Sequence, residues 1–339
     1  MSLVAIKSAI DTLSAPTISF TILTVLFPFF FPPSDWFERI HRKLGFWRLW
    51  TKAGGITGLV LITSFFVIGY YDKNFNITLT KADNFPIVLM IYSMFFFIWL
   101  GMYKAYRNDI RIDQGLKPEE YNDPDDKVLV WPDLVYIEFI ALILFQVFLI
   151  VWSILVAAPI EEPANPASTP NPSKAPWYFL GLQEMLVYYD PWIAGVLLPT
   201  MIIVGLMAIP YMDINKKGDG YYSFKERRVG MFIFMYGWVV LWLFLIVIGT
   251  FFRGPNWNFF GPFEYWDIHK VEALTNVNLS ELLWVKLLNQ GLPSNIFIRE
   301  SVGFLSVSFY LFVLPVILAK TVLKDMYEAY GPTRYTSLM

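Results

Sequence analysis

The sequence contains no cysteine and only two histidines, His41 and His269. Without cysteine the chain cannot form disulfides, Cys-ligated zinc sites or iron–sulfur clusters, and it cannot attach a haem covalently. Charge is also scarce: charged residues make up 16% of the 339, and the net charge is −2 with no long block of one sign. The chain therefore lacks the basic footprint of a nucleic-acid-binding protein, and any metal chemistry must come from elsewhere.

What the sequence has in excess is apolar surface. Hydrophobic side chains make up 56% of the residues, more than a soluble domain of this length could bury. A bilayer core needs roughly 17 to 25 apolar residues for each crossing helix. We therefore expect an all-α integral membrane protein with about seven transmembrane helices plus interfacial amphipathic helices. The predicted spans lie at 15–32, 55–71, 85–103, 134–158, 192–211, 229–252 and 302–323.

The distribution of positive charge predicts the orientation. Most of the 26 lysines and arginines fall in 33–54, 104–133 and 212–228 and after residue 319. Because cytoplasmic loops are enriched in these residues, we expect a multi-pass protein of the bacterial inner membrane, with its amino terminus outside and its carboxyl terminus in the cytoplasm. The first apolar run meets no small-residue cleavage site and is interpreted as a retained span.

Two stretches are typical of helices that lie at the membrane surface. Residues 35–50 interleave large apolar side chains with arginine and lysine, and 176–188 form a short aromatic segment. His41 belongs to the first stretch and is interpreted as an interfacial side chain rather than a haem ligand. His269 falls in a predicted loop, and no role is assigned to it.

The most informative stretch is a proline-rich strap at 159–176. Its prolines exclude helix and strand, so we expect an extended segment on the outer face. The strap leads into Trp177, Tyr178 and Phe179, which open the short apolar helix. A short aromatic helix at a membrane face is expected to cover a site.

These features resemble the carboxyl-terminal part of cytochrome b, which occurs as a separate subunit IV in chloroplast-type complexes and in several bacterial quinol:cytochrome c oxidoreductases. The ordered motifs that carry the resemblance are Trp131-Pro132-Asp133-Leu134, Glu162-Pro163-Ala164-Asn165-Pro166, Trp177-Tyr178-Phe179, Pro199 and Arg253-Gly254-Pro255-Asn256-Trp257.

The resemblance implies a function in electron transport of the respiratory chain. In that family the outer-face helix borders the site where quinol is oxidised, with one electron passing to a Rieske iron–sulfur protein and the other to a b haem. It therefore implies a quinol-binding site near Pro176, Trp177, Tyr178 and Phe179. Quinol or quinone would be bound at a site shared with other subunits, with proton release outside.

One motif residue of the family is missing. The usual Pro-Glu-Trp-Tyr reads Ala175-Pro176-Trp177-Tyr178 here, so the glutamate that takes a quinol proton is absent. A carboxylate in an apolar pocket has a raised pKa, which suits it to accept a proton. Glu184 lies two helical turns after Trp177 along the same face, so we hypothesise that Glu184 replaces the lost base; the alternative is that it faces interfacial water or caps a neighbouring helix.

The haem must be held by another chain. No predicted span contains a histidine, whereas the family binds its b haems between mid-membrane histidines. The expected partners are a haem-bearing cytochrome b amino-terminal subunit, a Rieske iron–sulfur protein, cytochrome c and membrane lipid, in a dimeric multi-subunit complex. We predict an amino-terminal three-helix membrane extension at 1–115, a subunit IV-like domain at 116–265, and an outer loop with the last span and tail at 266–339.

Two further charged residues have open interpretations. Glu138, near the cytoplasmic end of the fourth span, either serves proton uptake to an inner-face quinone site or extends its carboxylate toward the interface beside Asp133. Arg253 begins a turn where it could pair with a carboxylate such as Glu264 or contact a partner.

Three classes of function compete. The first is a non-autonomous subunit of a quinol:cytochrome c oxidoreductase, and the second is a structural scaffold of a respiratory or photosynthetic complex without its own active site. The third is a transporter or channel, which normally places ionisable or helix-breaking residues near mid-membrane. The predicted spans are nearly free of charge, which argues against the third.

Overall fold

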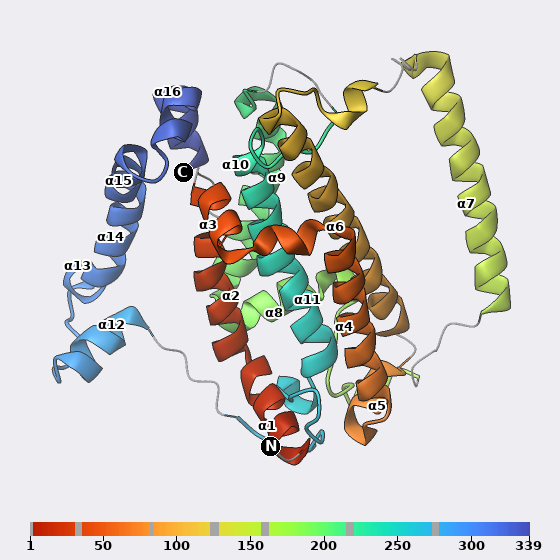
Figure 1. The fold of residues 1–339 in the computed structure, drawn as a ribbon. Coiled ribbons are helices and arrows are strands. Elements are labelled where there is room, and N and C mark those ends of the chain that lie inside the picture. The colour runs from red at the N-terminus through yellow and green to blue at the C-terminus, as the bar shows by residue number, and fades with distance from the viewer. Residues whose placement is uncertain are drawn as a thin grey trace. The chain divides into compact units, whose positions relative to one another are not determined.

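The computed structural model describes residues 3–30, 36–81, 84–122, 129–156, 163–214, 220–272 and 278–339. Over these ranges the chain is helical and contains no β-strand; extended pairing is limited to two isolated bridges, Asn165–Ser168 and Arg253–Phe259 (Figure 1). The prediction of an all-α integral membrane protein is confirmed.

Six helices in the described residues are long and apolar enough to cross a membrane. They match the last six predicted spans, although the helix predicted to end near residue 103 continues to Asp113. The six are α4 (Lys52–Tyr70), α6 (Phe85–Asp113), Val130–Leu155 with η4 (Val130–Leu134) and α7 (Val135–Leu155), Ile193–Met212 with η6 (Ile193–Leu197) and α9 (Leu198–Met212), Arg228–Phe252 with α10 (Arg228–Ile233), η7 (Phe234–Leu243), α11 (Phe244–Val247) and η8 (Ile248–Phe252), and Ser301–Lys320 with α14 (Ser301–Ser308), η11 (Phe309–Val313) and α15 (Leu314–Lys320).

The remaining elements are shorter, and four of them, α3, η1, η5 and α8, fall at the two stretches predicted to be interfacial. They are α1 (Leu3–Ser14), α2 (Pro16–Phe30), α3 (Trp36–Leu44), η1 (Phe46–Trp50), α5 (Lys73–Leu79), η3 (Glu119–Asn122), η5 (Trp177–Phe179), α8 (Leu180–Tyr188), η9 (Pro255–Trp257), α12 (Leu279–Glu281), η10 (Leu282–Leu287), α13 (Ile296–Arg299) and α16 (Lys324–Leu338).

The first predicted span, 15–32, corresponds to α2, and α1 precedes it; the two helices meet at 63°. The bend falls at Ala15, because the ring of Pro16 disfavours a helical conformation in the residue before it. The hydroxyl of Ser19 donates to the carbonyls of Ser14 and Ala15, both at 3.0 Å, and so satisfies backbone groups at the break. Counted as one span, the pair brings the total to seven.

The chain divides into two compact units, which are described separately. Unit 1 comprises Met1–Trp47, Lys174–Asp219 and Arg227–Met339, and unit 2 comprises Arg48–Ser173 and Gly220–Glu226. The predicted domains at 1–115, 116–265 and 266–339 are sequence modules, and that division stays a prediction.

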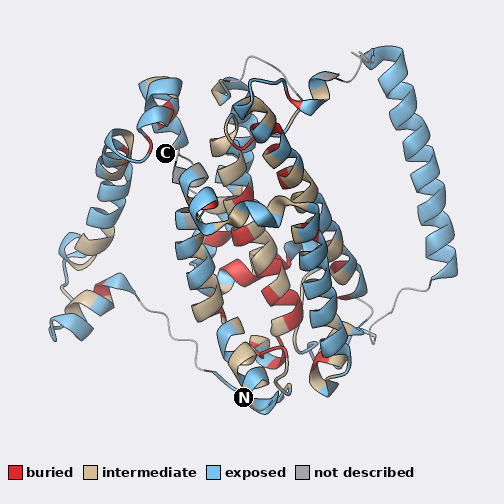
Figure 2. Ribbon diagram, in the orientation of Figure 1, coloured by how far each residue is buried: buried red, intermediate tan, exposed pale blue. Residues whose placement is uncertain are grey.

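The core of unit 1 lies where α8 meets α11 and η8. Met185 and Leu245 are buried there together with Ala194, and Figure 2 shows the buried residues concentrated around these elements. Gly249 permits the close approach, because a Cβ at this position would lie 3.3 Å from the carbonyl oxygen of Leu180. The short helix α8 is thereby fixed against the end of a membrane span.

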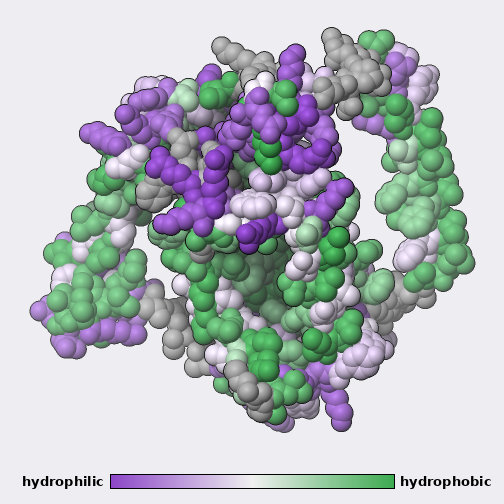
Figure 3. Space-filling view, in the orientation of Figure 1, coloured by the Kyte–Doolittle hydropathy of each residue, from purple (hydrophilic) through white to green (hydrophobic). Residues whose placement is uncertain are grey.

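In unit 2, α4 packs against α6, and the end of α6 holds the segment 220–226. The buried carboxylate of Asp109 accepts hydrogen bonds from the hydroxyl of Ser223 at 2.6 Å and from the backbone N–H of Phe224 at 3.1 Å. The same unit contains α7, which is exposed and hydrophobic along its length (Figures 2 and 3). Such a surface suits lipid or another membrane subunit.

Candidate functional site

The short helix α8 is preceded by an aromatic 3₁₀ turn. Pro176 directly precedes η5, and as a proline it has no backbone N–H that would need a hydrogen-bond partner. The backbone N–H of Ala175 donates to the side-chain oxygen of Gln183 on α8 at 2.9 Å. Pro176 is exposed, as are Trp177 (41%), Tyr178 (51%) and Phe179 (53%). The four residues predicted to bind quinol therefore form one contiguous exposed surface.

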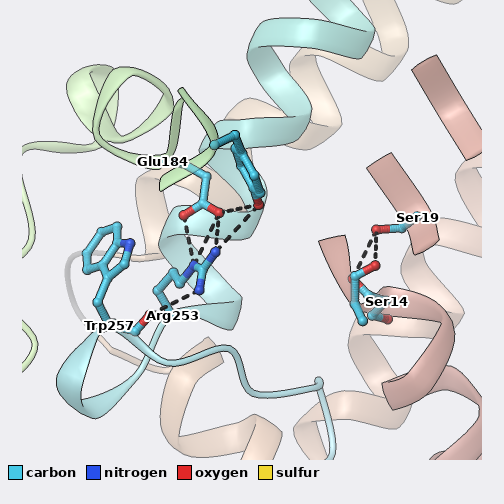
Figure 4. Close-up of polar contacts among 7 residues, drawn as sticks. Ser14, Ser19, Glu184, Arg253 and Trp257 are labelled. Carbon is cyan, nitrogen blue, oxygen red and sulfur yellow. Dashed lines mark hydrogen bonds and ion pairs between the residues drawn. The ribbon is translucent and has the colours of Figure 1, made fainter. Parts of the chain in front are cut away.

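Glu184 lies on the opposite, inner side of α8. Its side chain is 0% exposed, and its carboxylate points toward the guanidinium of Arg253, which follows η8 (Figure 4). Nη2 of Arg253 lies 2.6 Å from Oε1 of Glu184, and Nε lies 2.9 Å from Oε2. This is a buried two-point ion pair, the strongest geometry that arginine and a carboxylate adopt.

The sequence predicted that Glu184 lies on the same helix face as Trp177 and points into the pocket, whereas its carboxylate is buried against Arg253. The turn η5 has 3₁₀ geometry and α-helical geometry begins only at Leu180, so an ideal α-helical face cannot be extrapolated back to Trp177. The alternative interpretation was that Glu184 faces interfacial water or caps a neighbouring helix. Neither arrangement is formed, because the side chain is buried and paired with Arg253. It is held inside unit 1 by a partner from the adjacent span.

Tyr188, one helical turn after Glu184, completes the cluster. Its hydroxyl donates to Oε1 of Glu184 at 2.6 Å, while its ring remains 36% exposed. Burial of the hydroxyl raises the pKa of Tyr188 well above its ordinary value, and the charge and hydrogen bond of Glu184 raise it further. The phenol is therefore neutral throughout the physiological pH range. The i, i+4 spacing after Glu184 is the signal that could have identified Tyr188 from the sequence.

Arg253 is 5% exposed and is fully engaged. Burial lowers the pKa of its guanidinium, but the hydrogen bonds and charge of Glu184 outweigh burial and leave the pKa raised. Nη1 donates to the carbonyl of Trp257 at 3.0 Å (Figure 4). Removing one member of such a buried pair costs about 3–5 kcal/mol, because the other charge is left uncompensated.

The Arg-Gly-Pro-Asn-Trp motif forms the turn that presents Arg253. Gly254 is required because a Cβ there would lie 2.7 Å from the ring of Phe260 and 3.0 Å from that of Trp266. Asn256 and Trp257 both adopt left-handed backbone conformations, with φ of 57° and 58°. The turn returns the carbonyl of Trp257 to the guanidinium four residues earlier.

The predicted pairing of Arg253 with Glu264 is not formed. Glu264 instead accepts from Nζ of Lys270 at 3.0 Å, and that lysine also donates to the carbonyl of Phe259 at 2.7 Å. These contacts tie the two ends of the 259–270 loop together. The carboxylate partner of Arg253 is 69 residues away in sequence, a separation that loop patterning could not bridge.

A second cation near the site was also missed. Nζ of Lys174 donates to the backbone carbonyl of Thr250 at 2.8 Å and lies 5.5 Å from the ring centre of Trp266. Lys174 thus fastens the segment before Pro176 to the end of η8. Its position in a proline-rich strap gave no indication of this contact.

The other predicted residues make no contact that includes them in this cluster of Glu184, Tyr188 and Arg253. Glu138 is exposed in the first turn of α7, and both interpretations of it remain predictions. His41 is buried against the ring of Phe46, and His269 is exposed in a loop. Within the described ranges no group of three or more His, Asp or Glu side chains could hold a metal. Strap residues 159–162 and linker residues 123–128 lie outside the described residues.

Comparison with known proteins agrees with the resemblance seen in the sequence. Residues 163–263 match the family model described as cytochrome b (C-terminal)/b6/petD. The match spans both Glu184 and Arg253, so this segment of the chain is similar to the carboxyl-terminal part of cytochrome b. No solved structure matches the chain. Residues 1–162 and 264–339 lie outside the matched segment.

Proposed function

We propose that this chain is a non-autonomous membrane subunit of a quinol:cytochrome c oxidoreductase, and that it forms part of the quinol oxidation site on the outer face of a bacterial inner membrane. The family match supports the class of complex. The observation that carries the proposal is the segment formed by η5 and α8, which combines the exposed Trp177, Tyr178 and Phe179 of η5 with the buried Glu184 of α8, paired with Arg253.

The exposed aromatic surface is suited to one wall of a quinol pocket. Quinol is a flat aromatic ring with an apolar tail, and aromatic side chains bind such rings by offset stacking or edge-to-face contact. Tyr178 adds a phenol hydroxyl that can hydrogen-bond a quinol oxygen. The surface is only a wall, so a second subunit must close the pocket against it.

Glu184 is proposed to be the eventual acceptor of a quinol proton. Oxidation of quinol to quinone releases two protons and two electrons, so a base is needed close to the pocket. When Glu184 takes a proton, Arg253 retains the carbonyl of Trp257 and the neutral carboxyl as hydrogen-bond acceptors, which limits the cost of losing its counter-charge.

The residues present do not fit haem ligation, because neither histidine lies in a membrane-spanning helix. The proposed partners are a haem-bearing cytochrome b amino-terminal subunit, a Rieske iron–sulfur protein and cytochrome c. The chain itself supplies the pocket wall and the proton acceptor.

One observation favours a second candidate, a structural scaffold: the carboxylate of Glu184 is fully engaged by Arg253 and Tyr188, as a purely structural ion pair would be. A double substitution separates the two functions. Glu184→Gln combined with Arg253→Gln removes both charges and keeps two groups that can hydrogen-bond each other, so the assembled complex should be retained.

The double variant should assemble but lose most quinol:cytochrome c turnover, by about 10²-fold or more if Glu184 is the base. Glu264→Gln, which removes a half-buried carboxylate of the neighbouring loop, is the control and should keep normal turnover. Normal turnover in an assembled double variant would reject the catalytic role of Glu184 and favour the scaffold.

A further inference from the structure

The buried carboxylate of Glu184 cannot be reached directly from the surface of unit 1. Its side chain is completely buried, whereas Tyr188, whose hydroxyl lies 2.6 Å from Oε1, is 36% exposed. The charged groups that face this hydroxyl are Glu184 on the same helix and Arg253 after η8, whose Nη2 lies 3.5 Å away. Tyr188 is thus the partly exposed residue whose hydroxyl contacts the buried carboxylate.

A phenol hydroxyl in this position can pass a proton in both directions. It donates its own hydrogen to Glu184, and its oxygen lone pairs can accept a hydrogen from a second group. The raised pKa of Tyr188 disfavours a free tyrosinate. A proton would therefore move through Tyr188 in one concerted step, without a charged intermediate on the ring.

The ring of Tyr188 is held by a residue from the amino-terminal region. Phe20 on α2 stacks on Tyr188, with ring centres 6.0 Å apart and planes inclined by 20°. Phe20 also stacks on Phe244 of α11 at 5.9 Å and 4°. Both distances lie in the range of favourable aromatic pairs. Phe20 lies outside the segment that matches the cytochrome b family, so this support comes from the extension.

We propose that Tyr188 relays the proton between quinol and Glu184, and that Phe20 of the amino-terminal region positions Tyr188 for this transfer. This rests on the proposed quinol oxidation function. It gives a role to part of the amino-terminal region: α2 completes the site by fixing the relay.

The step balances as follows. The quinol O–H bond breaks as its proton passes to the oxygen of Tyr188, and the O–H bond of Tyr188 breaks as that proton passes to Oε1 of Glu184. One electron leaves the quinol for a one-electron acceptor of the complex, the Rieske iron–sulfur protein of the proposed function. Tyr188 ends neutral, Glu184 ends protonated, and a semiquinone remains. The reverse transfer later releases the proton through Tyr188 to water.

The test uses the complete complex purified with this chain, and it measures turnover with a short-chain quinol across pH in H₂O and D₂O. Tyr188→Phe keeps the ring but removes the relay, and should lower turnover at least about tenfold and change the solvent isotope effect. Tyr189→Phe removes the next hydroxyl along the chain and should leave both unchanged. Retention of the b-haem absorbance in each variant shows that the complex is assembled.

The positioning role of Phe20 is tested by two substitutions. Phe20→Leu keeps an apolar side chain but removes the stacking ring, and should lower turnover and shift the pH profile toward that of Tyr188→Phe. Phe20→Tyr keeps an aromatic ring at this position and should therefore keep the pH profile of the normal complex. A stability change without a change in pH profile would reject positioning by Phe20.

The outcomes separate this inference from the function on which it rests. If the normal complex oxidises quinol and assembled Tyr188→Phe turns over within about twofold of it, the relay is wrong while the proposed function stands. If the normal complex oxidises no quinol, the proposed function itself fails.

Discussion

The carboxylate of Asp11 accepts a hydrogen bond from the backbone N–H of Phe263 at 2.8 Å, across 252 positions of sequence. Nζ of Lys7 lies 5.2 Å from the centre of the Phe263 ring. The helix α1 therefore supports the loop that follows the Arg253 turn, while α2 supports Tyr188. Two parts of the amino-terminal extension thus contact structural neighbours of the proposed site.

We predict that Asp11→Ala loosens this loop. The substitution leaves the N–H of Phe263 without its acceptor, and a hydrogen bond to a charged, partly buried group contributes about 1–2 kcal/mol. The thermal unfolding midpoint of the purified protein in detergent should fall. Gly261→Ala should act similarly, because its Cβ would lie 2.4 Å from that of Asp11. An unchanged midpoint in both variants would contradict the account of this contact.

Two carboxylates near the end of α6, those of Asp109 and Asp113, contact segment 220–226 and differ in burial. Asp109 is buried and accepts two hydrogen bonds, so Asp109→Ala should cost about 1–3 kcal/mol. Asp113 is more exposed and pairs with Lys225, so Asp113→Ala should cost at most about 1 kcal/mol. Chemical denaturation in detergent measures both. Equal losses would show that burial does not set the importance of this contact.

Gly254 is predicted to be intolerant of any side chain. A methyl group would collide with Phe260 and Trp266 and displace the turn that presents Arg253, at a cost of about 1–3 kcal/mol. Gly205→Ala is the control, because the space around Gly205 in α9 is open and alanine favours helix. Limited proteolysis of the 253–270 loop should be faster in Gly254→Ala only; equal cleavage of both variants would contradict the packing described.

The raised pKa of Tyr188 predicts a loss of stability in alkali. Below pH 10 the phenol is neutral in both the folded and the unfolded chain, so its stabilising effect is fully present. As the pH rises above 10, the unfolded chain loses this proton while the folded chain keeps it, and the free energy of unfolding falls. Between pH 9 and pH 11 the thermal unfolding midpoint should decline less in Tyr188→Phe than in the normal protein.

Tyr189→Phe, which removes the next phenol hydroxyl along the chain, serves as the control. If the Tyr188→Phe and Tyr189→Phe curves run parallel, the hydroxyl of Tyr188 is not held as described.

The spans were predictable because bilayer thickness imposes their length and polarity. The amino-terminal bend was not predicted, because the predicted span began at residue 15 and the helix before Pro16 was not recognised. The aromatic segment was predictable from the run Trp177–Phe179, and its exposure follows from its 3₁₀ turn. The Glu184–Arg253 pair was not, because it joins residues on different elements, and sequence spacing carries no information on such a contact.

The prediction that Glu184 belongs to the site depended on its nearness to Trp177, and the orientation inferred from that spacing was wrong. The motif glutamate that accepts the quinol proton in the family is absent from this chain. The role of Glu184 therefore depends on the geometry of this chain. Tyr188 and Phe20 came from that geometry. The spacing of Tyr188 from Glu184 is a sequence signal that was missed, whereas Phe20 carries no charge or motif that would distinguish it among the 31 phenylalanines.

The most direct test of the central claim is purification of the tagged chain in mild detergent, followed by a dithionite-reduced minus ferricyanide-oxidised spectrum, mass identification of companions, and a quinol:cytochrome c turnover assay. A b-type haem band, with a histidine-bearing membrane subunit, a Rieske protein and quinol-dependent reduction of cytochrome c, is the predicted result. A stable preparation without haem, and without quinol oxidation, would contradict the account.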